Sequence, residues 1–292
     1  MRRAPFGRPM SSRLNPQNQP APDESPSNEP ENDSQNEVFF PGVWDVLRVR
    51  YLLQWKLQEG FPPELIDEII DEAEYWPSTV NHMEGKMPKW IRQDHDQVIL
   101  KTVPLCYDRE SIEQSSSPKP LPNRGRHPCR KIIFQITSHD QGGRGSITDE
   151  DRYRGTWTWF DTEIIQKAHT RNMYADGKEQ ELLENERGDR PRNFRPGDEG
   201  LLPHDNKLQV NARHCRTVQN HTIVWHYRDC IGPESHEAYF IERKQGRGRL
   251  TLDGRYVREL EIGDSIALWA KARFPGWVNY AYKASVRVFW AI

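Results

Sequence analysis

The fold is decided by the stretch Gly263-Asp264-Ser265-Ile266-Ala267-Leu268-Trp269-Ala270-Lys271-Ala272-Arg273-Phe274-Pro275-Gly276-Trp277, which continues into Ser285-Val286-Arg287-Val288-Phe289-Trp290-Ala291-Ile292. Apolar side chains recur there at every second position. This period of two, with Pro275-Gly276 in the connection, is typical of a pair of β-strands. We therefore expect the chain to end inside a sheet, with one face of each strand buried. The expected buried positions are Ile266, Leu268, Ala270, Ala272, Val286, Val288 and Trp290.

The composition is that of a protein that is folded only in part. The 292 residues suffice for one large domain or two small ones, and 35% of them are hydrophobic. However, 29% are charged and the mean hydropathy is -0.91, so we expect some of the chain to be disordered. Lysine and arginine (41) nearly balance aspartate and glutamate (43), which gives a net charge of -2. The charge therefore does not favour nucleic acid or an anionic membrane surface as a partner.

Residues 1–38 are rich in proline, serine, asparagine, glutamine and acidic residues and hold almost no aliphatic side chains. Such a segment buries too little apolar surface to offset the entropy of ordering, so we expect a disordered tail. No apolar run has the length of a signal-peptide core or of a membrane span. These features predict a soluble protein of the cytoplasm or nucleus, in which Cys106, Cys129, Cys215 and Cys230 stay reduced.

A helical segment is predicted over 39–80. Its first helix, ended by Gly60, is apolar over much of its girth, and we expect it to be buried. The apolar positions are Trp44, Leu47, Tyr51 and Trp55 on one face and Val46, Leu53 and Leu57 on the next.

A second helix begins at Phe61-Pro62-Pro63-Glu64, where a proline in the first turn costs no hydrogen bond, and it ends before Pro77. It carries an apolar stripe and an acidic face that we expect to meet water. The stripe comprises Leu65, Ile66, Ile69, Ile70, Ala73 and Trp76, and the acidic face comprises Asp67, Glu68, Asp71, Glu72 and Glu74.

The remainder of the chain is predicted to be mainly β. Residues 81–128 show only fragmentary strand signals, around Val98-Ile99-Leu100, and we interpret them as a linker with some ordered edges. Short strands with turns between them predict a β-sandwich over 129–292, interrupted by an exposed, charge-rich insertion at about 170–206. The predicted strands before the closing pair lie at Ile132–Ile136, Trp157–Trp159, Leu208–Val210, Ile223–Tyr227 and Tyr239–Ile241.

The turn and helix over Phe61–Ile70 resemble the opening of an F-box, with its proline-led turn, Glu-Leu pair and row of aliphatic residues. The resemblance implies docking to a Skp-type adaptor protein. It covers a short segment only, because Tyr75-Trp76-Pro77 stops the helix before any further F-box helix. A generic amphipathic helix that packs on the sandwich explains the same pattern. The implied docking residues are Pro62, Leu65, Ile66, Ile69 and Ile70.

Five further stretches resemble, in order and spacing, a domain of uncharacterised fungal proteins that has a galactose-binding-like jelly-roll fold and often follows an F-box-like helix. This resemblance covers most of 129–292. It implies the fold more than the function, because no catalytic activity is established for that group. The stretches are Ser138–Gly142, Gly155–Asp161, Leu208–Asn211, His221–Trp225 and Gly263–Trp277.

Two loops are candidates for ligand binding. His139-Asp140-Gln141-Gly142-Gly143 follows a predicted strand, and loops on a rigid scaffold are the usual place for ligand contacts. Asp140 and Gln141 match the hydrogen-bonding needs of hydroxyl groups, and Trp159 supplies a flat apolar platform for a sugar or peptide. The alternative is a turn satisfied by its own Asp and Gly, with the tryptophan in the core.

The second candidate loop is the closing turn. Arg273, Phe274 and Trp277 lie close together in the sequence, and arginine and aromatic residues concentrate at interface hot spots. They are therefore candidate ligand-binding residues. A turn held in place by Trp277 packing beneath it explains the same residues equally well.

The sequence favours neither a metal site nor a catalytic centre. No CxxC or HxxxH spacing occurs, and the adjacent His214 and Cys215 point to opposite faces if they lie on a strand. There is also no nucleophile elbow, phosphate loop or dinucleotide fingerprint. We therefore expect no catalytic residue, no metal and no cofactor. The residues whose types suit a metal ligand are His127, Cys129, His214, Cys215, His226 and Cys230.

The sequence thus predicts a non-enzymatic binding protein. One version is the substrate-recognition adaptor of a ubiquitin ligase, with a Skp-type adaptor on the helix and a protein or glycan on the sandwich loops. A carbohydrate-binding module without a link to ubiquitin and an enzyme of unknown type are the alternatives. Whether the stripe Leu65–Ile70 faces outward or packs on the sandwich separates the first two versions.

Overall fold

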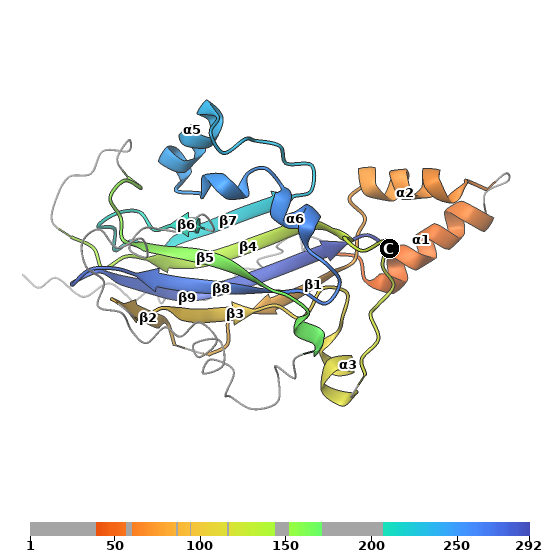
Figure 1. Cartoon of the computed structure of the whole chain (residues 1–292), viewed down its shortest axis with the longest axis horizontal. Helices are drawn as coiled ribbons and strands as arrows, with labels where there is room; N and C mark the ends of the chain where they lie inside the picture. Colours follow the sequence, from red (N-terminus) through yellow and green to blue (C-terminus); the bar gives the residue numbers. More distant parts are fainter. Residues whose placement is uncertain are drawn as a thin grey trace, which may run out of the picture. The chain divides into compact units, whose positions relative to one another are not determined.

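Two antiparallel β-sheets pack face to face in a computed structural model of the chain, with short helices before and between the strands (Figure 1). The structure describes residues 39–56, 60–85, 87–93, 95–115, 117–143, 152–170 and 207–292. The predicted tail over 1–38, and all but the first residue of the predicted insertion, lie outside these ranges. The chain divides into Met1–Phe39 and Phe40–Ile292, and the helices and sheets belong to the second unit.

The first sheet has the strand order β1-β9-β4-β7, with β2 also paired to β9, and the second has the order β3-β8-β5-β6. The first sheet consists of β1 (Ser78–His82), β2 (Lys89–Arg92), β4 (Cys129–His139), β7 (Gln219–His226) and β9 (Val278–Trp290). The second consists of β3 (Gln97–Lys101), β5 (Thr158–Ile165), β6 (Lys207–Val210) and β8 (Ser265–Ala272). The helices are α1 (Val43–Trp55), α2 (Pro63–Glu72), α3 (Arg109–Gln114), α5 (His236–Gln245) and α6 (Arg255–Glu259), with short 3₁₀ turns at Ala168–Thr170 and Arg249–Thr251.

The predicted inward positions of β8 and β9 are confirmed, but all residues of β8 are buried, so the expectation of a single buried face is wrong for that strand. All seven expected positions, from Ile266 to Trp290, are buried and belong to one core between the two sheets. The alternation therefore identified the correct inward faces, because only one face of each strand meets the other sheet.

The prediction that these two strands pair with each other is wrong. β8 lies in the second sheet and β9 in the first. The turn between them therefore crosses from one sheet to the other. The backbone N–H of Arg273 donates to the carbonyl of Trp157 at 3.0 Å, and the Asn279 side chain donates to the carbonyl of Trp159 at 3.0 Å, which fixes both ends of the crossing.

Two further corrections concern secondary structure. Residues 81–128 belong to the sandwich rather than to a linker, because β2 and β3 are edge strands of the two sheets. Edge strands of four or five residues are too short to give a clear period. The segment Tyr239–Ile241 is helical rather than extended, because the Ser235 hydroxyl caps α5 by accepting from the N–H of Ala238 at 3.1 Å, and Gly246 ends it in the left-handed conformation at φ 72°.

A buried polar network joins the two sheets near the end of β4. The Ser138 hydroxyl donates to Asn211 at 2.7 Å, and the Asn211 amide donates to Asn279 at 2.9 Å and to the Thr158 hydroxyl at 3.1 Å. Because buried amides that are fully paired are costly to separate, this network holds the loops at that end in a fixed arrangement.

Candidate functional site

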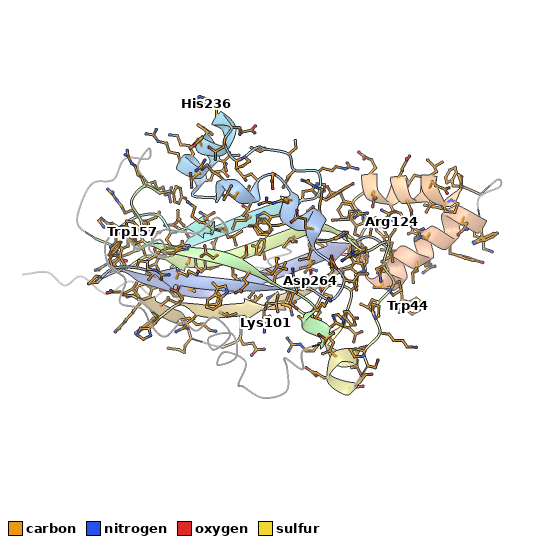
Figure 2. All side chains as sticks on the ribbon, viewed as in Figure 1. Trp44, Lys101, Arg124, Trp157, His236 and Asp264 are labelled. Carbon is orange, nitrogen blue, oxygen red and sulfur yellow. The ribbon has the colours of Figure 1, made fainter. Side chains whose placement is uncertain are left out.

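Two surfaces of the described chain are candidates, and they lie at opposite ends of the first sheet. Cys129, the first residue of β4, pairs with Trp290 beside the helices, whereas its last residue, His139, pairs with Tyr280. Figure 1 shows α1 and α2 at one end of the strands, and Figure 2 labels Trp44 and Trp157 at the two ends. At about 3.3 Å per residue, the eleven residues of β4 separate the two ends by roughly 35 Å.

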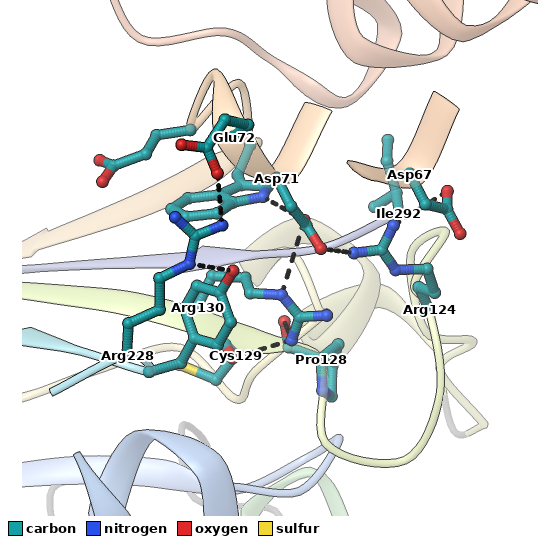
Figure 3. A network of polar contacts seen from close by, with 12 residues as sticks. Asp67, Asp71, Glu72, Arg124, Pro128, Cys129, Arg130, Arg228 and Ile292 are labelled. Atoms are coloured by element: carbon teal, nitrogen blue, oxygen red, sulfur yellow. Dashed lines mark hydrogen bonds and ion pairs between the residues drawn. The ribbon is translucent and has the colours of Figure 1, made fainter. Parts of the chain in front are cut away.

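Two residues of the acidic side of α2, Asp67 and Asp71, are partly buried and tied to the rest of the chain (Figure 3). Glu68, Glu72 and Glu74 are exposed, as expected. Asp71 forms an ion pair with Arg124 and accepts from the indole N–H of Trp76 at 2.8 Å. Asp67 pairs with Arg124 at 2.9 Å and with Arg50 of α1 at 2.5 Å. Although burial alone would raise the pKa of Asp67, the hydrogen bonds from the two guanidinium groups outweigh it and lower that pKa.

The aliphatic stripe of α2 is divided between the core and the surface. Ile66 and Ile70 are buried in the core, so they hold the helix on the sandwich. Pro62 and Leu65 are exposed, and Ile69 is half-buried. Within the predicted docking set, Pro62, Leu65 and Ile69 are therefore accessible to a partner.

The main apolar surface of this helical hairpin lies on α1, and the expected burial of its tryptophans is wrong. Trp44 is 82% exposed, Trp55 67% and Tyr51 52%. Together with Arg48 and Leu52 they follow the spacing of one helix face. The opposite face, around Val46 and Leu53, packs on the core. We call the exposed set Trp44, Arg48, Tyr51, Leu52 and Trp55 the aromatic face of α1.

At the other end, the structure brings most of the predicted ligand-binding residues together, but several serve as supports. Asp140 is fully buried and accepts from the N–H groups of Gly142 at 2.7 Å and His214 at 2.5 Å. Burial raises its pKa, although these backbone hydrogen bonds oppose the rise. Trp159 and Arg273 are also buried, and Arg273 makes a two-pronged pair with Asp96 at 2.5 and 2.8 Å.

His139 has both ring nitrogens engaged. Nδ1 lies 2.5 Å from the carbonyl of Asp140 and Nε2 lies 2.9 Å from the Tyr282 hydroxyl. The carbonyl can only accept, so Nδ1 carries the proton and Nε2 accepts from the tyrosine. The ring also stacks on Tyr280, with centroids 4.7 Å apart. His139 therefore positions the two tyrosines.

Gln141, Phe274 and Trp277 are partly exposed, as His139 is. The Gln141 side-chain carbonyl accepts from the N–H of Val278 at 3.0 Å, which ties the first loop to the start of β9. Trp277 lies beside His214, with ring centroids 5.4 Å apart, and Phe274 makes an edge contact with Trp157 at 4.7 Å. We refer to 140–143, 152–157, 211–218 and 274–277 as the loop end.

Sequence reasoning missed two sets of residues near this end. An aromatic row crosses neighbouring strands, where Trp90 of β2 pairs with Tyr280 of β9 and Tyr280 pairs with His139 of β4. Trp90 is 55% exposed. Trp90 was missed because it lies in the segment that the sequence predicts to be a linker. The alternate spacing of Tyr280 and Tyr282 could have identified the aromatic row. The second set is the arginines Arg152, Arg213 and Arg216, which no motif connects.

The described residues show no arrangement typical of catalysis. No group of three or more His, Cys, Asp and Glu among them is placed to hold a metal ion. The four cysteines are unpaired, and burial raises the pKa of the Cys106 and Cys129 thiols, so these two stay protonated near neutral pH. Among the helices of the described part, none has the length and apolar character needed to cross a bilayer.

Comparisons of the chain with protein-family models, with curated proteins and with solved structures find no match.

Proposed function

We propose that this protein is a non-catalytic binding protein, and specifically the substrate adaptor of a ubiquitin ligase. The α1–α2 hairpin docks a Skp-type adaptor protein, and the loop end of the sandwich holds a protein ligand. We also propose that the sandwich belongs to the galactose-binding-like jelly-roll class. The order of the elements supports the adaptor function, because a helical hairpin (α1–α2) comes first and a sandwich with a separate loop surface follows.

The aromatic face of α1 carries the proposal. A buried tryptophan or tyrosine removes about 150–250 Å² from water, yet three such side chains of α1 are more than half exposed. A contiguous exposed patch of large apolar side chains marks an interaction surface. The ion pairs of α2 with Arg124 and Arg130 hold the hairpin on the sandwich, so this face is presented rigidly.

The positive charge at the aromatic face of α1 indicates the kind of surface that this face would bind. Arg48 lies in the middle of the aromatic face and Lys56 follows it, and within the described ranges neither forms an ion pair with a carboxylate. The matching surface is therefore an apolar groove with an acidic rim. Phe61 and Leu65, each 38% exposed, extend the patch onto the turn and helix that resemble an F-box. A Skp-type adaptor is accordingly the occupant that we assign.

The test is binding of the purified chain to a Skp-type adaptor, measured by calorimetry. We expect micromolar or tighter binding that falls at least about tenfold in the double variant Trp44→Ala, Trp55→Ala, because truncated hot-spot aromatics cost more than about 1 kcal/mol each. The melting temperature should stay unchanged. Trp90→Ala is the matched control, an exposed tryptophan at the other end of the sheet. Absence of wild-type binding, or an equal loss with Trp90→Ala, would overturn the proposal.

A carbohydrate-binding module is the second candidate, and the aromatic row favours it. The exposed indole of Trp90 beside Tyr280, with ring centroids 5.9 Å apart, offers an apolar surface to the C–H face of a sugar, and tyrosine hydroxyls supply polar partners. Under this function Trp90→Ala abolishes binding to immobilised glycans, whereas the α1 variants leave it intact. The double variant Trp44→Ala, Trp55→Ala and the single variant Trp90→Ala therefore separate the two functions.

A further inference from the structure

We propose that the loop end binds an acidic peptide segment, held by the guanidinium groups of Arg152, Arg213 and Arg216. This inference rests on the proposed function in taking the loop end as the ligand surface, and it adds the chemical class of the ligand. It does not depend on what the helical hairpin binds.

Arg152 comes from the loop before β5, whereas Arg213 and Arg216 share the loop before β7, and contacts between loops bring them to one end of the sandwich. The N–H of Arg213 donates to the carbonyl of Arg152 at 2.8 Å. The Nε of Arg216 donates to the carbonyl of Gln141 at 3.3 Å. The loops before β5 and β7 therefore bring three positive charges to one end of the sandwich. The loop after β4 holds Arg216 in place there.

Glycines allow these side chains to lie close to the backbone. A Cβ atom at Gly142 would lie 2.2 Å from Cγ of Arg216, and one at Gly155 would lie 3.4 Å from Nη1 of Arg213. Both glycines have positive φ, at 73° and 66°, which side-chain-bearing residues rarely adopt. The stem of Arg216 is thus packed against the loop after β4, so less rotamer freedom is lost when its head group binds a ligand.

These charges are not neutralised within the described residues. Arg152, Arg213 and Arg216 form no ion pair there, in contrast to Arg124, Lys207, Lys271 and Arg273. Among the described residues of the loop end the one acid is Asp140, which is buried and accepts from backbone N–H groups. Asp96 is already paired with Arg273. The described residues of the loop end therefore carry more positive than negative charge, in a protein whose net charge is -2.

Burial makes part of this potential stronger than that of a solvated surface. The Nε atom of Arg213 and the Nε2 atom of His221 are buried without a hydrogen-bond partner. Arg152 lies close enough to His221 for its charge to lower the pKa of that ring, after burial as the first cause. A guanidinium group that is partly removed from water interacts more strongly with an approaching carboxylate.

The distribution of the charges favours a peptide over a small anion. The three arginines lie on two loops instead of converging on one backbone nest, which matches carboxylates spaced along a chain. Trp277 and Phe274, both partly exposed at the same end, offer apolar contacts between the charges. A neutral glycan would leave the three guanidinium groups without partners.

The test uses the full chain and a fluorescein-labelled peptide of alternating Glu and Ser, compared with a Gln/Ser peptide of the same length. We expect polarisation binding only with the acidic peptide, weakened severalfold when NaCl rises from about 50 to about 300 mM. The double variant Arg213→Gln, Arg216→Gln should weaken binding at least about tenfold. The matched control is Arg243→Gln, Arg255→Gln, which removes two exposed arginines of α5 and α6 and should leave binding unchanged.

Three outcomes would overturn the inference. They are equal binding of the two peptides, an equal loss with the control variant, and displacement of the peptide by inorganic phosphate at a matched concentration of charge, which would indicate a small-anion site. The Arg213→Gln, Arg216→Gln variant is also titrated with the Skp-type adaptor. Unchanged adaptor binding with lost peptide binding supports both proposals, whereas retained peptide binding without any adaptor binding refutes the adaptor function alone.

Discussion

Asp67 of α2 forms an ion pair with Arg124, with 2.9 Å between Oδ1 and Nη1. Arg124 belongs to the segment that leads into β4, so this pair connects the helical hairpin to the first sheet. Because Arg124 also pairs with Asp71, one side chain holds two turns of α2. The orientation of the aromatic face of α1 depends on this attachment, since Arg50 of α1 shares the same carboxylate of Asp67.

Replacing Arg124 by alanine should loosen the hairpin. The substitution removes one counter-charge from each of two partly buried carboxylates, and we expect a loss of about 1–3 kcal/mol in the free energy of unfolding. Hydrogen exchange should increase in α2 more than in β4. Arg126→Ala is the control, because Arg126 is 74% exposed at the side chain and pairs only with Glu261, and it should cost under about 0.5 kcal/mol. Equal effects of the two substitutions would contradict the attachment.

Two neighbouring isoleucines of α2 should respond in opposite ways to a charge. Ile69→Asp places the charge on the accessible side, so the chain should fold normally while binding to a Skp-type adaptor is lost. Ile66→Asp places it in the core, where Ile66 is 1% exposed, and should prevent stable packing of the hairpin. Circular dichroism melts and calorimetry measure the two effects. Normal adaptor binding by folded Ile69→Asp would refute α2 as part of the docking surface.

The two faces of β9 should differ in sensitivity. Val286 is fully buried between the sheets, and Val286→Ala should cost about 2 kcal/mol. Arg287 points outward, stacks on Phe40 at 3.8 Å and donates to the Ser78 hydroxyl at 3.1 Å, so Arg287→Ala should cost no more than about 1 kcal/mol. Urea unfolding measures both. A larger loss at Arg287 than at Val286 would show that the register is shifted by one residue.

Stability should fall in mild acid because of His221. Burial, with a smaller contribution from Arg152, lowers the pKa of His221 from 6.5 to about 4 in the folded chain. Between these pH values the unfolded chain binds a proton that the folded chain does not, so the free energy of unfolding rises with pH and is highest above 6.5. From pH 7 to 5 this group accounts for at most about 2 kcal/mol.

The variant His221→Gln isolates this contribution, because the ring has no hydrogen-bond partner at Nε2 to lose. Urea midpoints at pH 7 and pH 5 should differ less in this variant than in the wild type. His226→Gln should also reduce the difference, since burial lowers the pKa of His226 in the same direction. An unchanged pH dependence in His221→Gln would show that its ring is solvated.

The sequence by itself determined which strand faces are buried. Period-two patterns identified β4, β7, β8 and β9 and their inward residues correctly, since each of these strands meets the opposite sheet on one side only. It also located α2, although the helix ends at Glu72 and not directly before Pro77. The candidate ligand loop was found because it follows a strong strand, but the arginines at the loop end were not, since they are separated in sequence and share no period.

Tertiary structure decided which strands are neighbours, which helix face is buried and which charged side chains pair. Alternation says that β8 and β9 are strands but not which neighbours they pair with, so their placement in opposite sheets was not predictable. The first helix is apolar on nearly every side, and only packing around Val46 determined that Trp44, Tyr51 and Trp55 face outward. Asp67 and Asp71 read as a solvated face until Arg124, more than fifty residues away, supplied their counter-charge. Local sequence fixes the period of an element, whereas the face that is buried follows from the free energy of contacts between distant segments.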